Sequence, residues 1–162
     1  MTAGSDLLTE LSADHRTIRE LCTEFGGLPP GDGRRKPLLD RLAALLVRHG
    51  RTEEACLHPL LRHRPDHEAV AGRGRSEHRA IAELLTELTW RAPDAPGFDR
   101  LAADLVARVT AHLDAEEATA FPAAAGAAPA GELDHLGERA RRSRTGGPAT
   151  EHAAAGGLPG TA

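Results

Sequence analysis

Two stretches of this 162-residue chain carry the same string, H-x-x-x-E-E-x-x-x-x-P, at 49–59 and at 112–122. The second copy begins 63 residues after the first, and the same offset relates D-H-R, which begins at Asp14, to E-H-R, which begins at Glu77. One constant offset with no net insertion predicts a chain made of two copies of a helix–loop–helix unit. Each copy then has a leading histidine on its first helix and H-x-x-x-E on its second.

The spacing of apolar residues indicates helices throughout the repeated part. Leucine, isoleucine, histidine and cysteine recur at alternating steps of three and four residues, which place them on one face of a helix, and no segment sustains the alternation of a strand. The four segments with this spacing are 5–25, 42–60, 78–88 and 101–116. The breaks between them, each containing Gly and Pro, are 26–37, 64–75 and 92–97. Connections this short predict an all-α fold, an up-down antiparallel four-helix bundle with an internal pseudo-two-fold repeat.

The composition changes after the second repeated string. We expect residues 1–125 to form the bundle, and 126–162 to form a linker, a short polar C-terminal helix within 132–144 and a flexible, disordered tail. His135 and His152 lie in this last part of the chain and are expected to be solvated.

The charge and composition exclude several classes of partner. The net charge is −4 and the pI is about 6.1, so nothing predicts binding to nucleic acid. No run of about 18 apolar residues is present, which predicts no membrane span, and the N-terminus lacks the basic and apolar regions of a signal peptide. Cys22 and Cys56 fall in helical segments and are expected to be free, buried thiols in a reducing compartment. The expected location is therefore cytoplasmic.

Six side chains that can bind metal occupy the apolar stripes of these helices. They are His15, His49, Glu53, His78, His112 and Glu116. A helix buries such a stripe against its neighbours, and a His and a Glu four residues apart lie one above the other on it. An unpaired buried carboxylate costs several kcal/mol, and bound cations would remove that cost. The alternatives are histidines and glutamates on the helix surface, or a polar core joined by hydrogen bonds.

The number of donors points to two metal ions rather than one. Four imidazoles and two carboxylates exceed the four ligands of a tetrahedral zinc. Two octahedral ions offer about twelve positions, of which the imidazoles and two bridging carboxylates would occupy about eight. The remaining positions suit an oxo or hydroxo bridge and an exogenous ligand. Imidazoles with bridging carboxylates in a bundle favour iron, with zinc and manganese as the alternatives.

The order H…H-x-x-x-E…H…H-x-x-x-E on four helices resembles the hemerythrin-like family, also described as the hemerythrin HHE cation-binding domain, over residues 5–125. The resemblance implies a non-haem di-iron centre that binds or reacts with a small oxidant or gas: dioxygen, peroxide or nitric oxide. It also implies the ligand assignment, with His15 and His49 on one iron, His78 and His112 on the other, and Glu53 and Glu116 as bridges. Catalytic turnover stays open, as a peroxide-consuming (catalase- or peroxidase-like) enzyme or an oxidase. The alternative is a module that senses iron, oxygen or redox state without turnover.

The chain departs from the oxygen-carrying hemerythrins on its third helix. Those proteins have H-x-x-x-H there, whereas the residues four positions either side of His78 are Gly74 and Ala82. Neither can coordinate a metal through its side chain, so one iron is expected to be less crowded than in an oxygen carrier. A more open metal pair favours reaction with an oxidant over reversible oxygen transport.

Three further residues near the ligands are candidates for extra ligands or for side chains that orient a ligand. His58 occupies the position that matches Phe121 in the other copy, where the family usually has an aromatic residue. It follows Glu53 by five residues, about 140° around an α-helix, which disfavours a direct bond to the metal and leaves a hydrogen-bonding gate as the other interpretation. Glu54 and Glu117 lie about 100° from the ligand face and are expected to be solvated or to orient a ligand.

Overall fold

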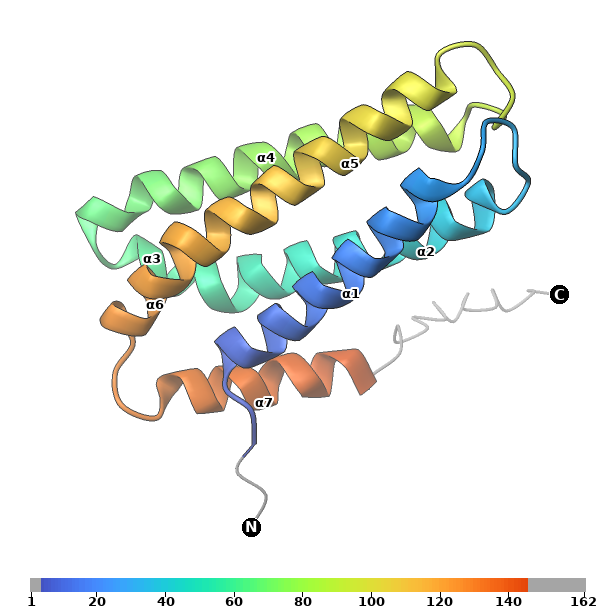
Figure 1. Cartoon of the computed structure of the whole chain (residues 1–162). Helices are drawn as coiled ribbons and strands as arrows, with labels where there is room; N and C mark the ends of the chain where they lie inside the picture. Colours follow the sequence, from blue (N-terminus) through green and yellow to red (C-terminus); the bar gives the residue numbers. More distant parts are fainter. Residues whose placement is uncertain (1–3, 146–162) are drawn as a thin grey trace, which may run out of the picture.

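The computed structural model describes residues 4–145. Within this range the chain is helical apart from short turns, and no strand forms (Figure 1). The elements are α1 Leu7–Gly27, α2 Arg35–Thr52, η1 Glu53–Leu57, α3 His58–Arg62, α4 Pro65–Thr89, α5 Phe98–Ala115, η2 Glu116–Ala120, α6 Phe121–Ala127 and α7 Glu132–Thr145. The prediction of an all-α chain is confirmed.

Four long helices, α1, α2, α4 and α5, lie side by side and make up most of the molecule (Figure 1). Helix α1 packs on α2 and helix α4 packs on α5, and further contacts join α1 to α5 and α2 to α4. The α1–α2 and α4–α5 turns lie at one end of the molecule, and α3 and α6 lie at the other (Figure 1). Each long helix therefore has two long neighbours against which it can bury a stripe of side chains.

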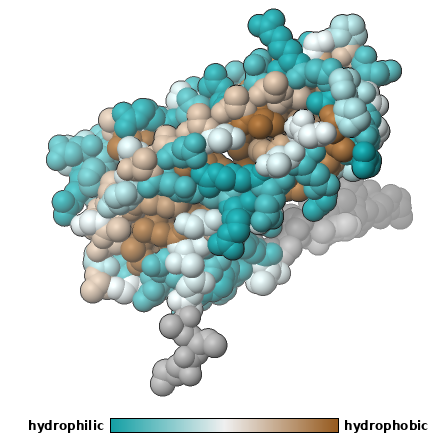
Figure 2. Space-filling view, viewed as in Figure 1, coloured by the Kyte–Doolittle hydropathy of each residue, from teal (hydrophilic) through white to brown (hydrophobic). Residues whose placement is uncertain are grey.

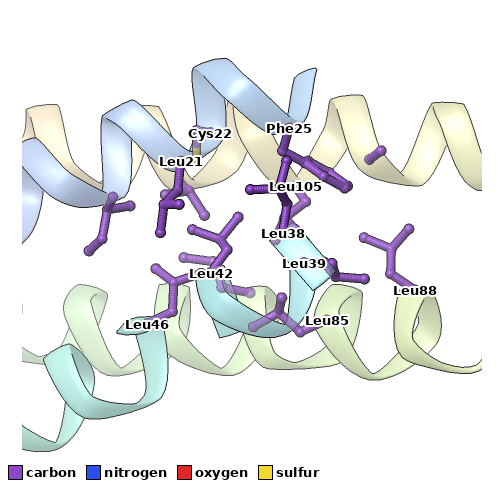
Figure 3. Close-up of a cluster of buried hydrophobic side chains, with 14 of the residues drawn as sticks. Leu21, Cys22, Phe25, Leu38, Leu39, Leu42, Leu46, Leu85, Leu88 and Leu105 are labelled. Carbon is purple, nitrogen blue, oxygen red and sulfur yellow. The ribbon is translucent and has the colours of Figure 1, made fainter. Parts of the chain in front are cut away.

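Two hydrophobic clusters fill the space between these helices, one towards each end. In the larger cluster, Leu21 from α1, Leu42 from α2 and Leu85 from α4 lie in the same interior space (Figure 3). The smaller cluster lies towards α3 and α6 and includes Leu57 and Ala124. The clusters leave a layer between them in the middle of the helices, and the predicted ligands lie in that layer.

The position of His15 on α1 shows how this layer arises. His15 follows Leu11 of the smaller cluster by four residues and precedes Ile18 of the larger cluster by three. All three side chains are fully buried, because steps of three and four residues return to the same face of a helix. Apolar packing therefore lies on both sides of the polar layer along the helices.

Hydrophilic side chains cover most of the face seen in Figure 2, and apolar patches lie between them. Val47 and Trp90 are the large hydrophobic residues that the described part of the chain leaves substantially exposed. Among residues 4–145, none of the helices has the length and apolar character that crossing a membrane requires. The apolar residues of the long helices are used mainly in the two internal clusters.

Each repeated string continues into a wider helical turn that begins at its glutamate. In the first copy, the N–H of His58 donates to the carbonyl oxygen of Glu53, which is the i→i+5 bond of a π-helix. Pro59 follows directly, and in an α-helix its ring would clash with the carbonyl four residues back, so the wider turn lets the chain continue as α3. The second copy repeats this arrangement in η2, with Glu116, Phe121 and Pro122.

The break predicted at 64–75 is wrong, because α4 begins at Pro65 and runs through this stretch. Proline is tolerated in the first turn of a helix, where its missing N–H has no intrahelical partner to lose. Gly72 and Gly74 each weaken a helix by roughly 1 kcal/mol relative to alanine, which is why the stretch resembles a loop in the sequence. Packing of α4 against α3 and α5 outweighs this cost.

Helix α7 occupies the stretch predicted to form a short polar helix, and it packs against α1. Arg141 and Arg144 of α7 lie 2.8 and 2.6 Å from the carboxylate of Glu10. Burial raises the pKa of Glu10, but a hydrogen bond from Ser5 and the two guanidinium groups outweigh it, so this pKa lies below its usual value. His135 is exposed on α7, and the predicted tail with His152 lies outside the described residues.

Gly137 of α7 lies against the backbone that leads into α1, and a side chain there should push the two segments apart. A Cβ at this position would collide with the backbone of Ser5 and Asp6. We expect Gly137→Ala to lower the free energy of unfolding by about 1–3 kcal/mol, measured by thermal unfolding. Gly126→Ala on α6 is the control, because nothing lies within 4 Å of a Cβ there and alanine favours a helix. Equal melting temperatures for the two variants would contradict the close approach of α7.

Candidate metal centre

The structure brings the six predicted ligands together as two groups that share both glutamates. One group is His15, His49, Glu53 and Glu116, and the other is Glu53, His78, His112 and Glu116. Within each group, one nitrogen or carboxylate oxygen per residue lies within 4.8 Å of all the others. Five of the six residues are buried, and the side chain of His78 is 16% exposed. The residues come from α1, the α2–η1 helix, α4 and the α5–η2 helix.

Each shared glutamate directs its carboxylate towards histidines of both groups. For Glu53, Oε1 lies 3.0 Å from Nε2 of His49, and Oε2 lies 2.8 Å from Nε2 of His78. For Glu116, Oε2 lies 3.3 Å from Nε2 of His15, and Oε1 lies 3.4 Å from Nε2 of His112. Glu53 and Glu116 therefore lie where carboxylates could bridge two ions.

The hydrogen bonds of the described residues leave this donor set largely unsatisfied. Although Nε2 of His49 and Nε2 of His78 lie close to Glu53, neither ring nitrogen of His49 and neither carboxylate oxygen of Glu53 makes a hydrogen bond of acceptable geometry. Nε2 of His15 and Oε2 of Glu116 also make no hydrogen bond. Buried polar atoms without partners are rare in native proteins. A cation that accepted these lone pairs would satisfy them together.

The facing nitrogens of His78 and His112 also suit a shared ion. Their Nε2 atoms lie 3.1 Å apart, where one neutral imidazole can donate a hydrogen bond to the other. Two nitrogens bound to one ion at about 2.0–2.1 Å, at roughly a right angle, would lie about 3 Å apart. The residues present therefore fit divalent cations in both number and spacing.

The carboxylates favour positive charge within the layer. Burial lowers the pKa of His49, but Glu53, Asp14 and Glu116 face it and raise this pKa well above its usual value. For Glu53, burial raises the pKa, but the neighbouring His49 and His78 lower it by more, so the Glu53 pKa lies well below its usual value. A cation would supply the positive charge that these carboxylates attract.

A carboxylate faces the second ring nitrogen of each histidine in the first group. Oε1 of Glu117 lies 2.8 Å from Nδ1 of His15, and Arg19 lies 2.8 Å from the same carboxylate. Arg19, followed by His15, holds the pKa of Glu117 below its usual value. Such contacts fix the orientation and tautomer of a metal-binding histidine. Glu117 therefore lies on the side of His15 away from the other ligands.

Asp14 faces His49 in a corresponding way. Its Oδ2 lies 3.5 Å from Nδ1 of His49, slightly beyond a hydrogen bond, and 2.8 Å from Arg144 of α7. Asp14, Arg19 and Arg144 are missing from the predictions, because their partners lie on other helices and spacing along one helix does not reveal them. The signal for Asp14 is its place directly before His15 in the D-H-R string.

His58 and Glu54 differ in how closely they approach the second group. His58 is 1% exposed, and its ring stacks on His78 with centroids 5.8 Å apart and planes at 23°. It belongs to neither four-residue group, and burial lowers its pKa. The separation of about 140° expected between Glu53 and His58 in an α-helix is wrong, because the wider η1 turn brings His58 back towards the side of Glu53. Glu54 is mostly exposed, and its Oε1 lies 3.9 Å from Nδ1 of His78, too far for a hydrogen bond.

Both cysteines are free and buried. Burial raises the pKa of the Cys22 thiol to about 11 and also raises the pKa of Cys56. Thiols with raised pKa values are weak nucleophiles and poor metal ligands at neutral pH. Both residues belong to the hydrophobic clusters, where they pack as small apolar side chains.

The hemerythrin HHE cation binding domain family matches residues 6–124, and the chain belongs to this family. Its fold is similar to that of a hemerythrin HHE cation binding domain-containing protein from Mycobacterium kansasii, known from a crystal structure. The TM-score is 0.77 at 24% sequence identity, over 87% of this chain and 86% of that chain. No curated protein matches the sequence.

Proposed function

We propose that this protein holds a non-haem di-iron centre that binds or reacts with dioxygen, peroxide or nitric oxide. The observation that carries the proposal is the pair of ligand groups that share Glu53 and Glu116. His15 and His49 would hold one ion, His78 and His112 the other, and the shared carboxylates would bridge them. Iron suits this mixture of imidazole and carboxylate, and zinc and manganese are the alternatives.

A di-iron pair would supply the exchange of electrons with a small oxidant. The protein's own residues hold and orient that pair. Glu117 can accept the Nδ1 hydrogen of His15, which leaves Nε2 free to bind metal. The two hydrophobic clusters exclude water from the two ends of the ligand layer, which strengthens electrostatic interactions within it.

We further propose that the sequence repeat is also a structural repeat. The four long helices would form an up-down bundle in which a pseudo-two-fold axis relates the α1–α2 unit to the α4–α5 unit. The bundle would span residues 1–125, and α7 would be an addition packed on α1. The equal places of Glu53 and Glu116 between the two ligand groups support this.

A sensing module is the second candidate function. It is favoured by Asp14, which lies between His49 of the site and Arg144 of α7. Loss of the metal would free His49 to move and would thereby weaken the hold of α1 on α7. If hydrogen exchange of α7 is equal with and without metal, this route of sensing fails.

Metal analysis with an optical spectrum tests the proposed centre. Protein purified from iron-replete cells should contain two irons per chain and show the charge-transfer bands of an oxo-bridged pair. Addition of hydrogen peroxide then separates turnover from simple binding. Oxygen evolution or oxidation of a co-substrate would support catalysis. A chain with one metal or none, purified from such cells, would contradict the proposal.

A further inference from the structure

The two ligand groups differ in the side chains that cover them. At the first group, the Phe121 ring stacks on His15 with centroids 5.1 Å apart and planes at 24°. The residue 63 positions earlier is His58, which stacks on His78 in the second group at nearly the same angle. An apolar ring therefore covers one histidine, and an imidazole covers its counterpart.

A second pair of matching positions differs in size. Leu11 on α1, four residues before His15, is fully buried in the smaller hydrophobic cluster. The residue 63 positions later is Gly74 on α4, and a Cβ there would lie only 3.1 Å from Nε2 of His58. Leu11 and Phe121 thus close the first group with carbon, whereas Gly74 leaves the space that the imidazole of His58 occupies.

The charges around the two groups differ as well. Arg19 pairs with Glu117 behind His15, and Arg48 lies 3.4 Å from Asp14 behind His49. The corresponding residues near the second group are Ala82 and Ala111, which carry no charge. Two arginines therefore lie behind the first group, whereas Glu77, the residue that matches Asp14, pairs with Arg108.

The second group also borders a cleft. A cavity of about 990 Å³ between α4 and α5 is lined by His58, Gly74, His112 and Glu116 among others, but not by His15, His49 or His78. His58 is almost wholly buried, and its Nδ1 has no hydrogen-bond partner. A buried polar atom without a partner, in a side chain that lines a cleft, suits a site that receives a polar ligand.

We infer that a small exogenous ligand is received at the second group, on the side of His112 that borders the cleft, and that His58 is its hydrogen-bonding partner. The ligand class is an anion of two or three heavy atoms, such as hydroperoxide or azide, which accepts a hydrogen bond. Gly74 makes room for the imidazole, and the cleft gives the ligand its route from solvent. The inference rests on the proposed di-iron centre, because such anions bind open positions on metal ions.

Azide is the probe, and the full-length iron-loaded protein is titrated with it while its absorption spectrum is recorded. His58→Phe gives the second group the aromatic cover of the first. The azide Kd should rise about tenfold or more, because a hydrogen bond to a charged partner is lost. His58→Gln retains a donor and should bind within about threefold of the unaltered protein. Phe121→Leu, the matched change at the first group, should leave the Kd within about twofold.

Iron content, measured on the same samples, separates this inference from the proposed function. If the unaltered protein does not hold two irons, the proposed centre fails. If it holds two irons and azide does not bind, the centre stands and the inference is overturned. The inference is also overturned if His58→Phe leaves the Kd within twofold, or if Phe121→Leu weakens azide as much as His58→Phe does. Loss of an iron from His58→Phe would show that His58 holds the metal itself and would overturn its role as the ligand's partner.

Discussion

Glu53→Gln should lose at least one of the two metal ions, with a fall in metal affinity of about a hundredfold or more. Glu53 is fully buried, and its two oxygens face histidines of both ligand groups. Glutamine has almost the same shape but carries no charge and presents only one acceptor oxygen. It can neither bridge two ions nor offset their charge. Metal analysis after gel filtration in metal-free buffer measures the loss directly.

Glu54→Gln is the matched control for this substitution. Glu54 is the next residue on the same helical turn, and its side chain is 57% exposed. The two variants therefore make the same chemical change one position apart, and Glu54→Gln should keep the metal content of the unaltered protein. If both variants keep the metal content of the unaltered protein, the bridging role of Glu53 is refuted. Equal loss in both would indicate a general effect of charge rather than a specific ligand.

Much of the architecture follows from spacing along the sequence. The steps of three and four residues identify the long helices, because the period of an α-helix is a local property. The constant offset then pairs His15 with His78 and Glu53 with Glu116 without any knowledge of tertiary structure. Ligands that share one face of a helix can therefore be predicted from their spacing in the sequence.

The predictions are wrong or incomplete where contacts between helices determine the local structure or the position of a side chain. The Gly-rich start of α4 resembles a loop until its packing on α3 and α5 is known. The position of His58 depends on the wider turn η1, which forms just before Pro59. The contact of Arg144 with Asp14 crosses 130 positions of the chain. No period or motif encodes such a contact, because its two residues share no helix.

Removal of the metal should lower the melting temperature by about 8–16 °C. Without cations, the layer between the two hydrophobic clusters contains unpaired buried nitrogens and carboxylate oxygens, which cost free energy in the folded state. A ligand that binds only the folded chain, at about 1,000 times its Kd, stabilises it by about 4 kcal/mol. For a chain of this size, each kcal/mol corresponds to about 2–4 °C. Thermal unfolding of dialysed protein, with and without prior chelation, measures the difference.

Glu53→Gln supplies the internal control, because a variant that has already lost metal should respond less to the chelator. Returning iron to the chelated, unaltered protein should restore its melting temperature, which excludes irreversible damage by the treatment. If chelated and metal-loaded protein melt at the same temperature, the unpaired atoms of the layer are satisfied without metal. The buried polar side chains would then be satisfied by hydrogen bonds and protonation. Loss of metal would not loosen the packing of α7 on α1, and the proposed sensing route would fail. A large and reversible shift would instead mean that the metal and the fold stabilise each other, as expected when ligands from four helices meet at one centre.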